Sequence, residues 1–441
     1  MVKLFPFQII GSKFLQSRKF ALLADDMGIG KTPQAIDAAR NLKKVLVVCP
    51  AVAKYNWQNE FIKFDNRKSY VHGGGRRIKK YNTIITSFNY LVTHLDIYKS
   101  KHWDVVIIDE AHLLKEPTAQ RTIAAFGSKG IIHHTDRLWA LTGTPAPNHA
   151  GELWVLLYTF GYTKLSYQGF IARYCNSHFI GGNRYSRVEI TGTNTKNSPE
   201  LKILLKKMSL RRLKKDVLDL PPIFHNTYYI KGDDDAKILK QYPELKEKLR
   251  EESERLKERL GIDINIDDEK LINSLQFLGQ SISSLRRYHG LKKIKETAEL
   301  IDFELKSKHY NKLIVFGIHK DVLSTLRKSL SRYKSVMIVG GTNDKKKKEA
   351  FTSFQNDNSI QIFYGNIQAA GMSITLTAAT QIIFIEDDWV PGNNKQAADR
   401  AHRIGQKETV NVRHIAIKDS LDAKITATLV RKIKEISTFI D

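Results

Sequence analysis

The sequence has little cysteine and no long apolar run, and these absences exclude several classes of protein. Its 441 residues include two cysteines, Cys49 and Cys175, too few for a disulfide framework or a cysteine-based zinc site. The apolar run 105–108 is far shorter than the roughly 20 residues that span a bilayer. No apolar segment typical of a signal peptide lies near residue 1. We therefore expect a soluble, intracellular protein in a reducing compartment, with no membrane partner.

Acidic residues are also scarce relative to basic ones. The chain has 71 Lys plus Arg against 46 Asp plus Glu, a formal charge of +25. Such an excess is typical of a solvated basic surface or of a protein that binds a polyanion, because Lys and Arg displace counterions from phosphates. Charge alone does not distinguish DNA, RNA and membrane lipid.

Short apolar runs recur near both ends of the chain and predict strands. Each is four or five residues long and is followed by a helix-like stretch. This pattern is typical of the α/β class, in which helices cover both faces of a parallel sheet. The runs are residues 20–23, 45–49, 83–86, 105–108 and 138–141, and then 313–316, 336–339, 360–363 and 382–385.

The two groups of runs predict two α/β halves with a different segment between them. We expect an N-terminal lobe at residues 1–160, a linker with helical protrusions at 161–300 and a C-terminal lobe at 301–441. Residues 176–198 are rich in Gly, Asn, Thr and Ser and favour a loop or hairpin. Residues 233–260 and 271–285 favour helices that pack on their own domain or form a coiled coil with a partner.

An apolar run, two glycines and a Lys-Thr pair follow one another early in the chain and predict a phosphate-binding loop. Gly28 and Gly30 allow backbone N–H groups to turn towards phosphate oxygens, and the helix that follows points its positive end at the same anion. Lys31 would neutralise the β- and γ-phosphates, and the Thr32 hydroxyl would bind Mg²⁺. Asp25 stands where the usual pattern has glycine, so a purely structural glycine turn is the alternative.

Two adjacent carboxylates, Asp109 and Glu110, end the apolar run 105–108. In a parallel α/β sheet, ligands bind at the carboxyl ends of the strands. Asp109 would bind Mg²⁺ through a water molecule, and Glu110 would polarise the water that attacks the γ-phosphate. The alternative is a strand end that carries ordinary surface acids.

Arg400 and Arg403 are three residues apart, a spacing that predicts one shared helix face. Two guanidinium groups so placed could stabilise charge on the γ-phosphate. They lie in the second α/β half, so we expect an ATP site shared between the lobes, whose closure converts hydrolysis into motion. An ordinary basic surface is the alternative.

These motifs and several others, in this order, resemble those of superfamily 2 helicases, and more closely the Swi/Snf-type ATPases. The resemblance runs almost from end to end of the chain. The segments that carry it are Leu4-Phe-Pro-Phe-Gln8, Ala24-Asp-Asp-Met-Gly-Ile-Gly-Lys-Thr32, Leu46-Val-Val-Cys-Pro50, Ile84-Ile-Thr-Ser-Phe88, Asp109-Glu-Ala-His112, Leu141-Thr-Gly-Thr-Pro145, Arg211-Arg-Leu-Lys-Lys-Asp-Val217, Leu313-Ile-Val-Phe316 and His402-Arg-Ile-Gly-Gln406. Residues 365–376 resemble the fifth helicase motif, with Ser373 where the family commonly has glycine.

The resemblance implies two RecA-like P-loop lobes, ATP and Mg²⁺ as cofactors, and DNA as the partner. The catalytic residues that it implies are Lys31, Asp109, Glu110, Arg400 and Arg403. The nucleotide would be bound by Gln8, as the adenine reader, and by Gly28, Ile29, Gly30, Lys31, Thr32 and Gln396. Mg²⁺ would be held by Thr32 and Asp109.

Within the family, the chain is most similar to the annealing, fork-remodelling subgroup, and its compact form also resembles phage-encoded fork helicases. The segments behind this are Ala24-Asp25-Asp26, Val315-Phe-Gly-Ile-His-Lys320 and Trp389-Val-Pro-Gly392. The implied function is an ATP-dependent translocase or helicase on duplex, forked or branched DNA, in fork remodelling, branch migration or strand annealing. We expect a monomer that works beside replication or recombination proteins, in the cytoplasm or nucleoid, or in a eukaryotic nucleus.

The resemblance also predicts the DNA contacts. They are Thr86, Ser87, Thr375, Arg211 and Arg212, with Arg76, Arg77, Lys79, Lys80, Lys214 and Lys215 as auxiliary candidates. For the basic clusters, a solvated surface is the alternative. Contacts to phosphates predict weak sequence preference and strong salt dependence.

Other functions remain open at the level of sequence. An RNA helicase is compatible with Asp109-Glu-Ala-His112, although residues 141–145 and 402–406 resemble the Swi/Snf side. A DNA-binding annealing module with an inactive ATPase is a second alternative, against which the intact Lys31 and Glu110 argue. A chromatin remodeller is a third, but no segment resembles a histone-reading domain.

Overall fold

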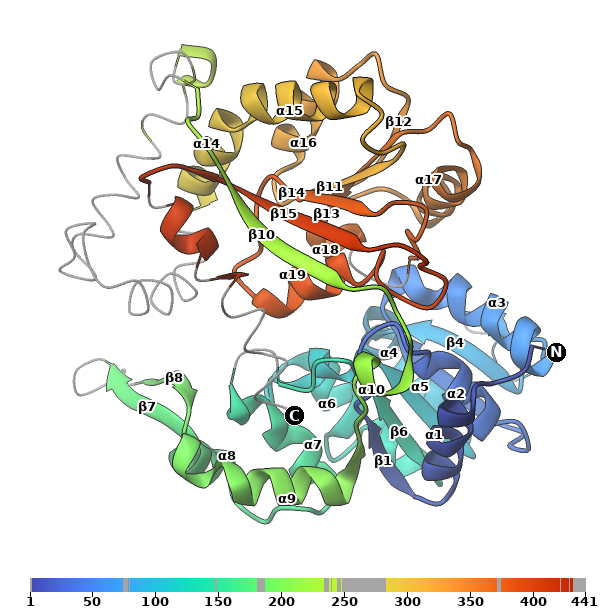
Figure 1. The fold of residues 1–441 in the computed structure, drawn as a ribbon. Helices are drawn as coiled ribbons and strands as arrows, with labels where there is room; N and C mark the ends of the chain where they lie inside the picture. Colours follow the sequence, from blue (N-terminus) through green and yellow to red (C-terminus); the bar gives the residue numbers. More distant parts are fainter. Residues whose placement is uncertain are drawn as a thin grey trace. The chain divides into compact units, whose positions relative to one another are not determined.

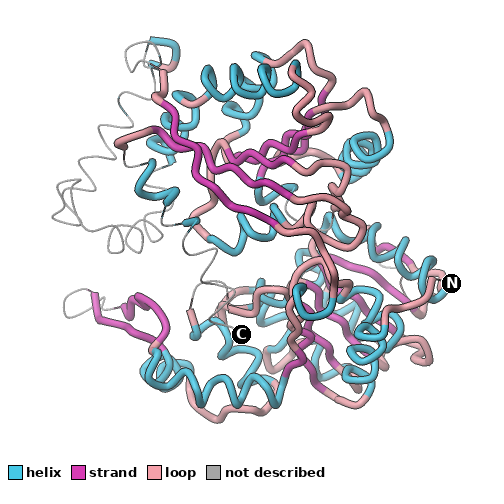
Figure 2. Tube along the Cα trace, viewed as in Figure 1, coloured by secondary structure: helices cyan, strands magenta, loops and turns pink. Residues whose placement is uncertain are grey.

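The computed structural model of the chain has two compact units, Met1–Asp219 and Leu220–Asp441. Figures 1 and 2 show the course of the chain in each. The structure describes all residues except 1, 74–77, 79, 147–148, 181–186, 234–237, 239, 244–246, 248–282, 371–373, 421, 428 and 431–441.

In its described part, the first unit contains a parallel sheet with the strand order β3-β4-β2-β5-β6-β1-β9 (Figure 1). The strands are β1 (Phe20–Leu23), β2 (Val45–Cys49), β3 (Tyr70–Val71), β4 (Thr83–Ser87), β5 (Val105–Asp109), β6 (Leu138–Leu141) and β9 (Ser209–Leu210). The five apolar runs predicted for this half are therefore confirmed as strands. A separate antiparallel hairpin, β7 (Cys175–Ile180) and β8 (Arg187–Thr193), lies where a loop or hairpin was expected.

Helices cover both faces of this sheet, because its strands bury side chains on both sides. In β2, Val45 and Val47 belong to one core, and Leu46 and Val48 belong to the other. Helices α1 to α3 pack in the first core and α4 to α9 in the second. The described helices are α1 (Pro6–Gln16), α2 (Lys31–Ala38), α3 (Lys54–Asp65), α4 (Phe88–Thr93), α5 (Leu95–Lys99), α6 (Gln120–Phe126), α7 (Trp154–Thr159), α8 (Tyr167–Tyr174), α9 (Ser198–Met208) and α10 (Lys214–Val217).

The second unit is built in the same way around a parallel sheet with the order β10-β15-β14-β11-β13-β12 in its described part. Figure 1 shows β10 and β15 as the long pair at one side of the sheet. The strands are β10 (Ile223–Ile230), β11 (Leu313–Gly317), β12 (Ser335–Ile338), β13 (Ile362–Asn366), β14 (Gln381–Phe384) and β15 (Val410–Ile417).

Two cores again lie on the two faces of the second sheet. Val315 of β11 packs with α14 to α16, whereas its neighbour Phe316 packs with α17 to α19. The helices are α14 (Ser283–Lys292), α15 (Ile294–Lys306), α16 (Lys320–Ser329), α17 (Asp344–Asn356), α18 (Ile367–Ala370) and α19 (Pro391–Ala398). The predicted α/β class, with two parallel sheets flanked by helices, is confirmed.

The boundary between the units lies inside the stretch that we expected to form a linker with protrusions. Helices α8 and α9 and the β7–β8 hairpin belong to the first unit, whereas β10 and α14 belong to the second. Strand β10 was not among the predicted runs, because its inward and outward residues alternate and break the apolar signal. The helices predicted at 233–260 and 271–285 fall largely outside the described residues.

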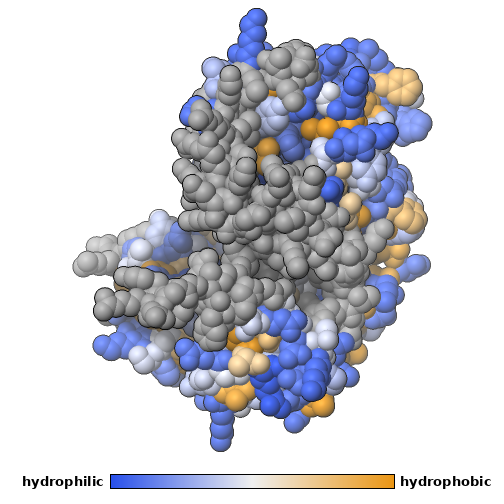
Figure 3. Space-filling view, turned by 90° about the vertical axis from the view of Figure 1, so that its left-hand side faces the viewer, coloured by the Kyte–Doolittle hydropathy of each residue, from blue (hydrophilic) through white to orange (hydrophobic). Residues whose placement is uncertain are grey.

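Hydrophilic side chains predominate where the face drawn in Figure 3 is coloured. On the face drawn in Figure 3, small hydrophobic patches are separated by hydrophilic side chains. The exposed large apolar residues are scattered over many elements, for example Ile10, Ile62, Ile203 and Phe303. Among the described residues, no helix combines the length and the apolar character that crossing a bilayer requires.

Candidate active site

The loop between β1 and α2 has the geometry of a phosphate-binding loop. Gly28 and Gly30 have φ angles of 82° and 86°, in the left-handed region that favours glycine. Gly30 also caps α2, so the positive end of that helix opens at the loop. A Cβ atom on Gly30 would lie 2.4 Å from the side-chain nitrogen of Gln8. Glycine is therefore favoured here by the backbone conformation, and any other residue would also displace the end of the Gln8 side chain.

The ammonium group of Lys31 lies inside this loop. Its Nζ donates hydrogen bonds to the carbonyl oxygens of Asp25 at 2.8 Å and Asp26 at 3.2 Å. Burial lowers the pKa of Lys31, and the nearby carboxylates, with Glu110 first, oppose that shift. The cation is thus held between the loop and the acidic pair, where it can neutralise phosphate oxygens.

Asp25, at the position of the usual glycine, is buried and held by Arg212. Arg212 Nε donates to Asp25 Oδ1 at 3.0 Å, and Arg212 Nη2 donates to Asp25 Oδ2. Gln34 joins this pair to the loop, since its Nε2 donates to Asp25 Oδ2 at 3.1 Å and to the Gly30 carbonyl at 3.0 Å. These charge-assisted bonds fix the first residues of the loop relative to the start of α2.

The segment that carries Arg212 runs beside the loop as an extension of the sheet. The backbone N–H of Ala24 donates to the Leu210 carbonyl at 2.8 Å, and that of Asp26 donates to the Arg212 carbonyl at 2.9 Å. Arg211 Nη1 donates to the Ala24 carbonyl at 2.9 Å. Both arginines therefore support the phosphate-binding loop.

Gln8 of α1 packs against the same loop. Its Nε2 donates to the Ile29 carbonyl at 3.0 Å, and its Oε1 accepts from the Phe5 N–H at 3.0 Å. The structure thus brings together the predicted nucleotide-binding residues of the first unit, which are Gln8, Gly28, Ile29, Gly30, Lys31 and Thr32. The role of Gln8 as an adenine reader stays a prediction.

The acidic pair lies at the same edge of the sheet. Leu23, the last residue of β1, and Asp109, the last residue of β5, both pair with Leu141 of β6. A single strand therefore separates the start of the phosphate-binding loop from Asp109. The loop after β6 is equally close, because a Cβ atom on Gly143 would lie 3.3 Å from Lys31 Nζ.

Asp109 and Glu110 are held in defined orientations. Trp57 Nε1 donates to Asp109 Oδ2 at 2.8 Å, and burial together with the charge of Glu110 raises the pKa of Asp109 to about 6. Glu110 has a left-handed φ of 52°, which is strained for a residue with a side chain. His112 Nδ1 lies 3.3 Å from a Glu110 carboxylate oxygen and 3.1 Å from Thr142 Oγ1.

The oxygen donors at this edge fit Mg²⁺. Burial, and after it the charge of the adjacent Glu110 carboxylate, raise the pKa of Asp109, and a bound cation would oppose both effects. The described residues contain no cluster of three or more His, Cys, Asp or Glu side chains suited to a metal. Mg²⁺ in a nucleotide site is usually held by one or two carboxylates together with the phosphates, so such a site needs no larger cluster.

In the second unit, the predicted catalytic arginines follow α19. The prediction of a shared helix face was wrong, because the helix ends at Ala398. The hydrogen bonds then tighten, with Arg400 N donating to Ala397 O at 3.1 Å, and Arg400 lies in a turn and Arg403 in a bend. Arg403 Nη1 donates to the Ile374 carbonyl at 3.1 Å, so this segment packs on the loop that resembles the fifth helicase motif. Gln396 is buried in α19.

The predicted DNA contacts need correction at several positions. Thr86 is 0% exposed, with its hydroxyl 2.6 Å from the Tyr98 hydroxyl, and Ser87 is 3% exposed and caps α4. Arg211 and Arg212 are engaged at the phosphate-binding loop. For Thr86 and Ser87, the motif marks a position in the chain, whereas burial decides whether the side chain reaches the surface. Arg211 and Arg212 are half-buried, and a DNA contact by either stays a prediction.

The remaining predicted contacts differ in exposure. Thr375, in the second unit, is half-buried. Lys80 and Lys215, in the first unit, are exposed, and Lys80 Nζ lies 5.2 Å from the Tyr81 ring centroid. Lys214 is buried. Arg76, Arg77 and Lys79 lie outside the described residues.

Sequence reasoning missed three residues of this site. Trp57 and Gln34 were given no role, and Asp25 was treated as a departure from the pattern. For Asp25, the signal was an acidic residue inside a loop that binds anions, which requires a counter-ion elsewhere in the chain.

Comparisons with known proteins agree with this geometry. Residues 7–277 match the SNF2-related domain, and residues 292–405 match the helicase conserved C-terminal domain. The chain is 32% identical, over 95% of its own length and 59% of the relative's, to a Caenorhabditis elegans protein named SWI/SNF-related matrix-associated actin-dependent regulator of chromatin subfamily A-like protein 1 homolog. It is 29% identical, over 98% of its length and 40% of the relative's, to the DNA annealing helicase and endonuclease ZRANB3 of Bos taurus.

The chain thus spans between 40% and 59% of the length of these two curated relatives. A solved structure, the Sulfolobus solfataricus SWI2/SNF2 ATPase core in complex with dsDNA, is similar over 100% of this chain and 93% of that chain, with 24% identity and a TM-score of 0.45.

Proposed function

This chain belongs to the SNF2-related family, and we propose that it is an ATP-driven motor that moves along DNA. The observation that carries the proposal is the convergence of Lys31, Asp109 and Glu110 at one edge of the first sheet. Hydrolysis at a γ-phosphate needs charge neutralisation and a positioned water more than it needs covalent chemistry, and these three side chains supply both.

In the proposed reaction, each side chain has a separate task. The loop N–H groups and Lys31 bind the phosphates, while Thr32 and Asp109 would hold Mg²⁺, which would neutralise phosphate charge. Glu110 accepts a hydrogen bond from the attacking water and aligns it. The contact of His112 with the Glu110 carboxylate, at 3.3 Å, keeps that carboxylate in one direction.

We propose that Arg400 and Arg403 also act in hydrolysis, by stabilising charge on the transferring phosphate. An arginine in that role contributes on the order of a thousandfold or more to kcat. Arg400→Ala and Arg403→Ala should therefore lower kcat strongly. Lys407, an exposed cation in the same segment, provides the control, since Lys407→Ala should leave kcat unchanged. Equal and small effects of all three changes would favour a plain basic surface.

The proposed substrate is duplex, forked or branched DNA. Two observations support it, namely the charge of +25 and the similarity to a relative whose name describes a DNA annealing helicase. The finer proposal is fork remodelling, branch migration or strand annealing by a monomer in the compartment that holds the DNA. Phosphate contacts should dominate, so affinity should fall steeply with salt and depend weakly on sequence.

The deciding experiment is ATP hydrolysis measured without nucleic acid and with single-stranded DNA, duplex DNA, a forked junction and RNA. Lys31→Ala serves as the blank, and Glu110→Gln tests the water-aligning role. We expect strong stimulation by forked or duplex DNA that both substitutions abolish. Stimulation by RNA at an equal or higher level would instead indicate an RNA helicase. DNA annealing that persists unchanged in Glu110→Gln would indicate a module with an unused ATPase.

A further inference from the structure

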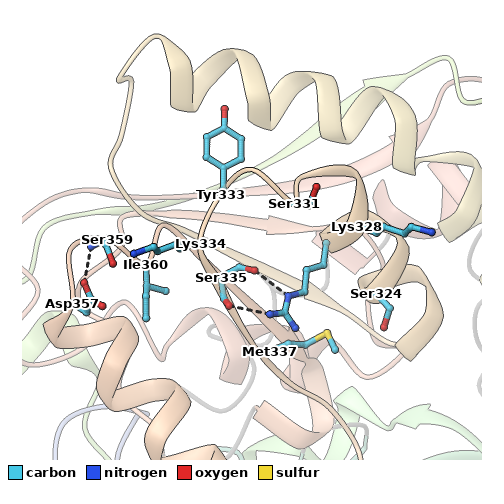
Figure 4. Close-up of a pocket in the computed structure, with 11 residues that line it drawn as sticks. Ser324, Lys328, Ser331, Tyr333, Lys334, Ser335, Met337, Asp357, Ser359 and Ile360 are labelled. Atoms are coloured by element: carbon cyan, nitrogen blue, oxygen red, sulfur yellow. Dashed lines mark hydrogen bonds between the residues drawn. The ribbon is translucent and has the colours of Figure 1, made fainter.

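The second unit carries an open, basic groove that the motor site does not use. It has a volume of about 720 Å³ and is formed by the last turns of α16, the connection from α16 to β12, the start of β12 and the turn before β13. Figure 4 shows the lining side chains. We refer to it below as the α16–β12 groove.

The groove lies at the amino ends of the strands of its sheet. Ser335 is the first residue of β12, and Ile360 precedes β13 by two residues. The loop that resembles the fifth helicase motif follows the carboxyl end of β13, and Arg403 packs on that loop. Because parallel strands place all their amino ends at one edge of the sheet, the groove and these motor residues occupy opposite edges of the second unit.

The charge of the groove is positive. Arg327, Lys328 and Lys334 line it, against one carboxylate, Asp357. Asp357 is already engaged, because its Oδ1 accepts the Ser359 N–H at 2.8 Å and the hydrogen bonds from Ser359 lower its pKa. Arg332, in the same connection, forms an ion pair with Asp302 instead. The lysines are thus the cations that the groove presents to a ligand.

The position of the cations favours an extended anion over a single one. Figure 4 shows Lys328 and Lys334 on opposite sides of Ser335, with Lys334 at the end near Asp357 and Ser359. Arg327 lies between them in the structure, because its Nε donates to Ser335 Oγ at 3.0 Å and its Nη2 to the Ser335 carbonyl at 3.1 Å. A line of cations fits a ligand with repeated negative charges.

The same arginine argues against a peptide strand as the ligand. β12 is an edge strand of its sheet, and an added strand would need the free backbone groups of that edge. Arg327 occupies the Ser335 carbonyl, a device that protects sheet edges from strand addition. A polyanion that needs charge rather than a backbone ladder remains the better fit.

We propose that the α16–β12 groove binds the sugar-phosphate backbone of a second DNA segment, the other arm of a forked or branched substrate. This rests on the proposed DNA motor function and extends it, because two separate contact regions distinguish branched from linear DNA. The groove would raise affinity for branched DNA by holding one arm while the motor site acts on another, as linked binding sites do. Its contacts are to phosphates, so they carry no sequence preference.

The test compares Lys328→Glu/Lys334→Glu with wild type and with the matched control Lys295→Glu/Lys418→Glu, which reverses two exposed lysines of the same unit outside the groove. Hydrolysis of ATP is titrated with a four-way junction and with a short linear duplex, over a series of salt concentrations. Far-ultraviolet circular dichroism of each variant confirms folding.

We expect the groove variant to lose affinity for the junction on the order of tenfold and to keep its response to the linear duplex. Its slope of log affinity against log salt on the junction should fall by about two, one for each lost phosphate contact. The control variant Lys295→Glu/Lys418→Glu should lose little affinity for either the junction or the linear duplex.

Two results would overturn the proposal. One is an unchanged junction affinity in the groove variant, and the other is an equal loss on junction and linear duplex. A wild-type protein whose hydrolysis responds to no DNA would refute the motor function instead. Junction binding measured directly by fluorescence anisotropy needs no hydrolysis, and it would then still show whether the groove binds DNA.

Discussion

The Arg212 guanidinium and the Asp25 carboxylate form a buried, bidentate ion pair beside the phosphate-binding loop. The Asp25 side chain is 0% exposed and that of Arg212 is 14% exposed. A buried carboxylate without its partner is strongly unfavourable, so each of the two residues requires the other. The pair explains how the loop keeps its form with an acid at the usual position of glycine, since the acid brings its own counter-ion.

Arg212→Ala should lower the free energy of unfolding by about 3–5 kcal/mol and raise the KM for ATP, because it leaves Asp25 buried and unpaired. Urea unfolding followed by tryptophan fluorescence measures the first effect, and steady-state hydrolysis measures the second. The double change Asp25→Ala/Arg212→Ala should cost less than the sum of the single changes.

The exposed pair Arg173–Glu200, with side chains 50% and 47% exposed, provides the control. Arg173→Ala should lower the free energy of unfolding far less than Arg212→Ala, since solvent screens such exposed pairs. Additive losses in the Asp25 and Arg212 cycle would contradict the interdependence of that pair.

Asp109→Asn should stabilise the protein at neutral pH. The pKa of Asp109 is raised to about 6, so its protonated form stabilises the folded state below about pH 4, and this contribution is lost as the pH rises through 6. Asparagine removes that penalty and can still accept from Trp57 Nε1. The gain should be on the order of 1–3 kcal/mol at pH 7.5 and should vanish near pH 4. Unfolding curves at pH 7.5 and pH 4 measure this gain in stability. An equal gain at both pH values would contradict the raised pKa of Asp109.

Gly30→Ala should abolish ATP hydrolysis. Alanine at a φ of 86° is strained, and its Cβ would lie 2.4 Å from the Gln8 amide nitrogen, so the end of the Gln8 side chain must shift from its contact with the Ile29 carbonyl. Gly341 has nearly the same φ of 83° but nothing within 4 Å of an added Cβ. Gly341→Ala therefore shows the effect of backbone strain alone, and we expect it to leave hydrolysis intact. Similar losses in both variants would refute the importance of the Gln8 contact.

Thr86→Val should destabilise the protein without weakening DNA binding. The Thr86 hydroxyl is buried and lies 2.6 Å from the Tyr98 hydroxyl, so its removal breaks a buried hydrogen bond and costs about 0.5–1.5 kcal/mol, while the Tyr98 hydroxyl keeps its hydrogen bond with His72 Nδ1. Because the Thr86 side chain does not reach the surface, we expect the variant to keep the affinity for DNA and the salt dependence of that affinity unchanged in titrations. A reduced salt slope would restore Thr86 as a DNA contact and would require that part of the protein to open on binding.

The sequence was sufficient for the elements whose signal is local. The run Val45–Cys49 is apolar at every position, because both faces of a parallel strand are buried, and it predicted β2 correctly. Lys31 and Asp109 could be found for a similar reason, since a strand, a loop of glycines and a charged end are contiguous in the chain. By contrast, β10 alternates inward and outward residues at the edge of its sheet and gave no comparable signal.

The sequence by itself determined the α/β class and located the glycine-containing loop after β1 and the acidic pair after β5, because each depends on neighbours in the chain. Only the tertiary structure decided the place of Arg212, which is 187 residues from Asp25 and meets it through the pairing of β9 with β1. Only the structure decided that Thr86 is buried and that α19 ends before Arg400. Burial and long-range pairing depend on residues that are distant in the chain, and a local pattern contains no information about them.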